Sequence, residues 1–74
     1  MRYEIIREIF NECSKNQMRD VSVEEREVED IDAYMDQFRT GKDLVEERTV
    51  AKDGTIVYDI VADGLKQRIS FTEA

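Results

Sequence analysis

The chain has 74 residues, which is enough for one small domain over 1–74 and too few for two. Its 18 acidic and 11 basic side chains give a formal net charge of −7, which excludes a protein that binds nucleic acid through a general basic field. Because the chain has no histidine and only one cysteine, it lacks the usual general base, the usual zinc ligands and any disulfide framework.

The first segment, residues 3–10, fits two structures. As a strand it divides its apolar residues between two faces, whereas as a helix it gathers Ile6, Ile9, Phe10 and Cys13 on one stripe. We favour the strand, because no N-cap residue precedes the segment and its three isoleucines disfavour an uncapped helix. The helix remains the alternative.

Residues 13–17 predict a hairpin loop, and a second strand follows within 18–28. Its residues alternate between polar and apolar, with Val21 and Val23 expected to face inward.

A helix is predicted over 30–40. Four apolar residues recur at helical spacing on one stripe: Ile31, Tyr34, Met35 and Phe38. Asp30 is a suitable N-cap, Asp32 falls in the first turn where the helix dipole favours negative charge, and Gly41 stops the helix. We expect the apolar stripe to pack on one face of a sheet.

Two Asp-Gly pairs, at 53–54 and 63–64, predict hairpin turns between three strands at 44–51, 55–62 and 67–72. The middle strand is apolar on both faces and is therefore expected to be central. The predicted fold is α+β, an antiparallel sheet of about five strands with one helix, in the order ββαβββ; a helical first segment would make it αβαβββ. The expected core comprises Ile5, Ile9, Val21, Val23, Tyr34, Phe38, Ile56, Tyr58, Ile60, Ile69 and Phe71.

Almost all of the excess negative charge lies between residues 24 and 36. This acidic run contains one base, Arg26, and seven acids: Glu24, Glu25, Glu27, Glu29, Asp30, Asp32 and Asp36. One interpretation is a solvated surface that keeps the protein soluble. The other is an acidic patch that docks on a basic surface of another protein, and the concentration of the charge in one segment favours it.

Other chemistry is not indicated. Asp30, Asp32 and Asp36 are spaced somewhat like a calcium loop, but Met35 replaces its glycine and the closing glutamate is missing. Cys13 has no histidine to activate it, and the three glycines are explained by turns and a helix stop. We therefore expect no catalytic residue, no metal site and no cofactor.

What remains is a binding function. In size, charge and lack of catalytic groups the chain is similar to small acidic phage and mobile-element proteins that imitate nucleic acid, including anti-restriction and anti-CRISPR inhibitors. This similarity implies an inhibitor whose acidic patch occupies the basic site of a nuclease or defence complex, without contacting nucleic acid itself. The alternative is a regulatory or scaffolding module that docks through an apolar sheet face or an edge strand.

Location and assembly follow from composition as expectations. The N-terminus does not have the pattern of a signal peptide, no apolar stretch is long enough to cross a bilayer, and a lone thiol is ordinary in a reducing compartment, so we expect a cytoplasmic protein. A thin core and a sheet covered on one face only suggest a homodimer.

Overall fold

The computed structural model describes the backbone of residues 1–13 and 16–74, and the side chains of 1–10 and 20–74. The elements in chain order are β1 (Arg2–Cys13), β2 (Asn16–Glu27), α1 (Ile31–Met35) with a 3-10 turn (Asp36–Phe38), β3 (Val45–Val50), β4 (Ile56–Ala62) and β5 (Leu65–Glu73). This confirms the α+β class and the order ββαβββ, with the first segment a strand. The loop predicted over 13–17 is shorter than expected, and residues 14–15 lie outside the described part.

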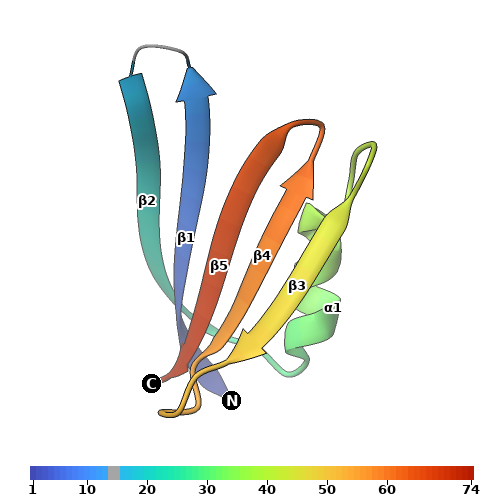
Figure 1. The fold of residues 1–74 in the computed structure, drawn as a ribbon. Coiled ribbons are helices and arrows are strands. Elements are labelled where there is room, and N and C mark those ends of the chain that lie inside the picture. The colour runs from blue at the N-terminus through green and yellow to red at the C-terminus, as the bar shows by residue number, and fades with distance from the viewer. Residues whose placement is uncertain (14–15) are drawn as a thin grey trace.

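The five strands form one antiparallel sheet in the order β2-β1-β5-β4-β3 (Figure 1). The Asp-Gly turns join β3 to β4 and β4 to β5, so these three strands form the predicted meander with β4 inside the sheet. The N-terminal hairpin of β1 and β2 then adds to the free edge of β5 through β1. A hydrogen bond 2.9 Å long, from the Ala74 amide to the Arg2 carbonyl, joins the end of the meander to the start of the N-terminal hairpin.

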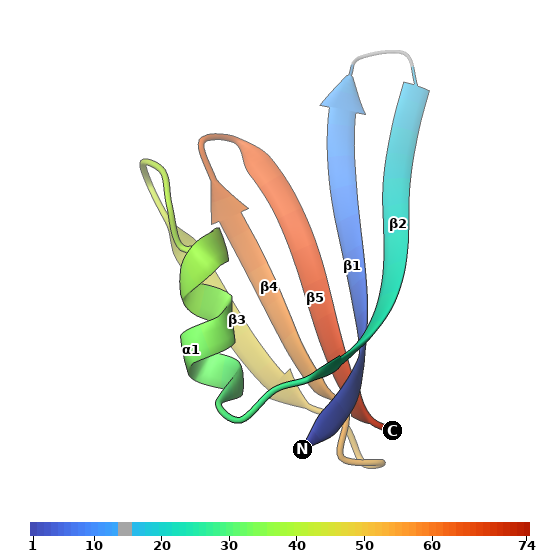
Figure 2. The same ribbon diagram turned by 180° about the vertical axis from the view of Figure 1, so that it is seen from behind.

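Helix α1 covers one face of the sheet (Figure 2). Asp30 caps it as predicted, because its carboxylate accepts hydrogen bonds from the amides of Asp32 (3.0 Å) and Ala33 (3.3 Å). The α-helix is shorter than the predicted 30–40 and ends at Met35, with one further turn of 3-10 helix.

The connection from the helix to β3 is pinned to the turn between β4 and β5. Gly41 has a φ of +125°, and a Cβ at this position would lie 2.5 Å from a carboxylate oxygen of Asp63. That carboxylate accepts a hydrogen bond from the Lys42 amide, and the Asp63 amide donates back to the Lys42 carbonyl. Gly41 therefore allows the close approach to this turn and is not the helix stop that was predicted, because the α-helix ends at Met35 and Arg39 caps the 3-10 turn.

The core lies between α1 and the sheet. Its buried residues are Ile5, Val28, Met35, Tyr58, Ile60, Ala62, Ile69 and Phe71. Phe71, on the middle strand β5, is at its centre and meets the rings of Tyr3, Tyr34 and Tyr58 edge-on, with centroids 5.7 to 6.3 Å apart. Tyr34, Phe38 and Ile56 are half-buried against this cluster. Within the described residues, no helix is both long and apolar enough to cross a membrane.

The prediction that Val21 and Val23 belong to the core is wrong. They are 51% and 64% exposed, because the register of β1 with β2 places them opposite Glu8 and Ile6, on the face away from the helix. Their alternation is strand-like as predicted, but the alternation does not say which face a helix will cover. Ile9 is on the helix side and only half-buried, while Val28 and Ala62 are core residues that the pattern did not indicate.

Candidate docking surface

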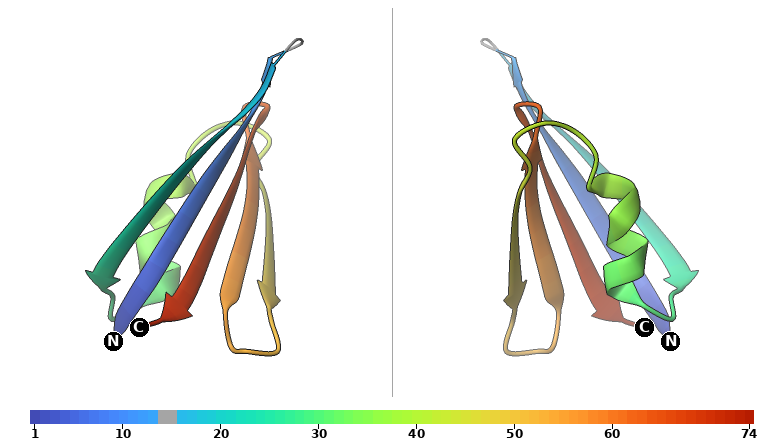
Figure 3. Two further views of the ribbon diagram at one scale, coloured as in Figure 1. Left: turned by 90° about the vertical axis from the view of Figure 1, so that its left-hand side faces the viewer. Right: turned by 90° about the vertical axis from the view of Figure 1, so that its right-hand side faces the viewer.

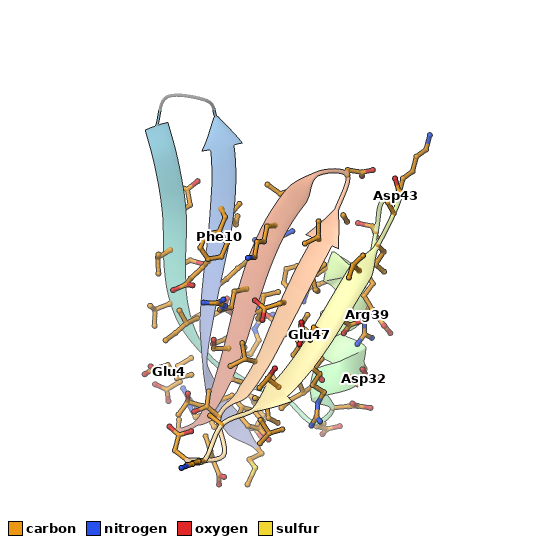
Figure 4. All side chains as sticks on the ribbon, in the orientation of Figure 1. Glu4, Phe10, Asp32, Arg39, Asp43 and Glu47 are labelled. Atoms are coloured by element: carbon orange, nitrogen blue, oxygen red, sulfur yellow. The ribbon has the colours of Figure 1, made fainter. Side chains whose placement is uncertain are left out.

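The sheet face opposite α1 is not covered by another element of the described chain, and we call it the open face (Figure 4). The strand registers place the following described residues on it: Arg2, Glu4, Ile6, Glu8, Val21, Val23, Glu25, Glu27, Val45, Glu47, Thr49, Val57, Asp59, Val61, Lys66, Arg68, Ser70 and Thr72, together with Phe10. Side chains directly opposite on neighbouring strands share a face, so this set follows from the pairing alone.

Apolar side chains on the open face remain accessible. Val45 is 63% exposed at one edge, and Val21 and Val23 are also more than half exposed at the other. Four further apolar residues on the inner strands are half-buried: Ile6, Phe10, Val57 and Val61. The face is thus neither a core nor an ordinary polar surface, and it can exclude water from a partner that covers it.

The open face is also acidic. Among the side chains that the structure describes, it carries six carboxylates, those of Glu4, Glu8, Glu25, Glu27, Glu47 and Asp59, against three cationic side chains, Arg2, Lys66 and Arg68. Arg68 donates to Asp59 at 2.9 Å, and this hydrogen bond raises the pKa of Arg68 above its usual value. Lys66 and Arg68 also lie over the ring of Phe10, at 5.5 and 5.7 Å from its centroid, so these cations are largely occupied within the molecule.

The acidic run from Glu24 to Asp36 does not form one surface. Glu25 and Glu27 lie on the open face, Glu24 lies on the helix side of β2, and the other four follow the chain across to α1. All seven side chains are exposed. On β2 each of the three glutamates has a cationic partner: Arg26 for Glu24, Arg2 for Glu25 and the N-terminal amine for Glu27.

On the helix side, three carboxylates surround the guanidinium of Arg39. Its guanidinium contacts carboxylate oxygens of Asp32, Asp36 (2.7 Å) and Glu46 on β3 (2.7 Å), and it donates to the Asp32 carbonyl. These hydrogen bonds, that of Glu46 above all, raise the pKa of Arg39 further above its already high value. The spacing of Asp32, Asp36 and Arg39 along a helix could have indicated this cluster from sequence, but the contribution of Glu46 could not.

The described part of the molecule contains no group of three or more side chains that could hold a metal ion. A hollow of about 280 Å³ lies on the helix side, and its three charged side chains already have partners. Glu24 there binds Arg26 at 2.8 Å, while Arg7 donates to Gln67 and lies over the ring of Phe38. The side chain of Cys13 is outside the described residues.

No family model, no curated protein and no solved structure matches the chain. The open face and the distribution of charge are therefore the observations on which a function can be proposed.

Proposed function

We propose that this protein is a non-catalytic binding domain that docks its open face on a basic surface of another protein. In its most specific form the partner is a nucleic-acid-binding protein, such as a nuclease or a defence complex, and the domain occupies the site that normally holds phosphates. The observation that supports this is the excess of carboxylates on a sheet face whose apolar side chains are still exposed.

The open face suits such a partner better than the helix side does. Glu4 and Glu47 have no ion pair among the described residues, so arginine and lysine side chains of a partner can bind them without displacing an internal cation, whereas Glu8 lies opposite Arg68. Asp32 and Asp36, by contrast, are already bound to Arg39. The apolar residues between the carboxylates would give the complex a dry centre, which charge alone does not supply.

A second candidate is a regulatory or scaffolding module whose partner contacts mainly the valines of the open face. The exposure of Val21, Val23 and Val45 favours it. In that case the carboxylates serve chiefly for solubility, and binding should depend little on salt.

The two candidates can be separated with one pair of variants. We expect Glu4→Lys/Glu47→Lys, which reverses two unpaired charges on the open face, to abolish capture of the partner from a lysate of the source cell. The matched control is Glu29→Lys/Glu73→Lys, which makes the same change in net charge away from the open face. Each captured protein is identified by mass spectrometry, purified and titrated again at low and high salt, with duplex DNA as a competitor.

The proposal expects a basic nucleic-acid-binding protein whose affinity falls steeply with salt and which DNA displaces. Equal loss in both double variants would show that binding depends on the net charge of the domain and not on the open face. Neutral partners that ignore salt and are lost on Val57→Asp would establish the second candidate instead.

A further inference from the structure

Strand β2 presents an unpaired backbone edge along its whole described length. It pairs with β1 only. The amide of Val28 donates to the Met1 carbonyl at 2.9 Å, and since hydrogen bonding alternates along an antiparallel strand, even-numbered residues here face β1. The N–H and C=O groups of Val21, Val23 and Glu25 therefore point outward. The left panel of Figure 3 views the molecule from this side, and no other described element lies in front of β2.

The surface of the molecule is large for its mass. The accessible area is 5444 Å², whereas a compact protein of 8.7 kDa exposes about 4,700 Å². Every residue from 20 to 27 is exposed, on both faces of β2.

Strand β2 carries one pair of opposite charges, Asp20 and Arg26, that would face each other across two copies. We propose that two copies of this chain join edge to edge through β2, antiparallel, with Val23 opposite the partner's Val23. In this register Asp20 lies opposite Arg26 of the partner subunit, twice by symmetry. Both are at non-hydrogen-bonded positions, where facing side chains are closest. Val21 and Glu25 provide further backbone pairing, for about six hydrogen bonds between residues 21 and 25 of the two strands.

Neighbouring registers are less favourable. Centring the pair on Ser22 would place Asp20 opposite the partner's Glu24, and centring it on Glu24 would place two glutamates face to face. The other sheet edge, β3, is half as long as β2, and the register that pairs its Glu46 with Arg48 would place Glu47 opposite itself. Of these registers, the one centred on Val23 alone places opposite charges face to face with no like charges opposite each other.

The consequence is one sheet of ten strands whose two open faces lie on the same side. A symmetric partner, or two copies of one partner, could then be held by a continuous acidic surface. The dimer is independent of the proposed function, because it uses the edge of β2 and leaves the open face uncovered.

The first test is a proline on the edge. Val23→Pro removes an N–H that faces outward and breaks no internal hydrogen bond, so we expect a folded monomer of 8.7 kDa by light scattering where the wild type shows twice that mass. The matched control is Val50→Pro on β3. The Ala51 amide donates inward to Thr55, so the Val50 N–H also faces outward, and dimerisation should be unaffected.

The second test addresses the register. Asp20→Arg places like charges opposite Arg26 in both symmetric positions and should raise the dissociation constant at least roughly tenfold. The double variant Asp20→Arg/Arg26→Asp restores opposite charges and should recover most of the affinity. Amide hydrogen exchange supplies an independent readout, since the Val23 amide should become protected only as the protein concentration rises.

A wild type that stays at 8.7 kDa at every concentration would overturn the proposal. A dimer that survives Val23→Pro, or that is lost with Val50→Pro, would place the interface elsewhere. Failure of the double variant to recover affinity would refute the register.

Discussion

Among the described side chains, Arg39 alone links the helix segment to the sheet edge through ion pairs. Only 20% of it is exposed, and its three carboxylate partners come from α1, the 3-10 turn and β3. The planar guanidinium can serve several acceptors at once, which the single ammonium of lysine cannot do with the same geometry. Without it, Asp32, Asp36 and Glu46 would repel one another.

We expect Arg39→Ala to lower the free energy of unfolding by about 1–2 kcal/mol, because the exposed carboxylates lose their shared partner and water screens part of the cost. Arg39→Lys should lose less, since it keeps the charge. Urea denaturation at low ionic strength measures both. Arg48→Ala, at an exposed arginine of β3 with no ion pair among the described residues, serves as the control and should stay within about 0.5 kcal/mol of the wild type. Equal effects of all three variants would show that the cluster contributes nothing specific.

At the scale of the element, β4 shows how one strand serves two environments. Tyr58, Ile60 and Ala62 are buried beneath the helix, while Val57, Asp59 and Val61 point to the open face and remain half-exposed. Both faces are apolar enough that the sequence predicted a central strand, and β4 is indeed inside the sheet. The asymmetry between its faces comes from α1, which covers one of them.

That asymmetry gives a prediction for neighbouring residues of β4. Ile60→Ala should destabilise the fold by about 2–5 kcal/mol, because Ile60 is fully buried and the truncation leaves a cavity. Val61→Ala should cost about 1 kcal/mol or less, because its side chain is only half-buried on the open face. Chemical denaturation measures both values, provided that the slope of the unfolding free energy against denaturant concentration is the same as in the wild type. If Val61→Ala proved the more damaging, the open face would have to be covered in solution.

At the scale of the whole molecule, the chain is extended for its length. Its principal extents are 38 × 23 × 22 Å and its radius of gyration is 12.8 Å, against about 11.3 Å for a compact domain of this size. The difference arises because β1 and β2 continue beyond the N-terminal end of β5 (Figure 1). Strand β1 stops pairing with β5 at Phe10 but pairs with β2 as far as Cys13. A thin, one-sided core of this kind benefits from a partner subunit.

Thermal unfolding should therefore depend on concentration. If two copies unfold together, the midpoint should rise by about 5 °C for each tenfold increase in protein concentration, because mass action favours the dimer. Val23→Pro should remove this dependence while leaving a cooperative transition. Scanning calorimetry over the widest attainable concentration range measures it, and a midpoint that does not move in the wild type would contradict a dimeric native state.

The sequence by itself determined the elements and their order, because each has a local physical cause. The Asp-Gly pairs require turns, Asp30 offers a cap, and alternation at 55–62 and 67–72 requires strands. The strand assignment for residues 3–10 also held, on the absence of a cap and the cost of isoleucine in a helix.

Only the tertiary structure decided which face of the sheet is covered and what surrounds each charge. Val21 and Val23 alternate as core residues do, yet they face outward, because the register of β2 with β1 places them on the side that α1 does not reach. The acidic run is one segment in the sequence and several surfaces in space, since a strand sends neighbouring side chains to opposite faces and the chain then crosses to the helix. The open face, with Glu4 on β1 and Val45 and Glu47 on β3 drawn from two distant parts of the chain, exists only once the strands have paired, because contacts between distant segments depend on register rather than on local pattern.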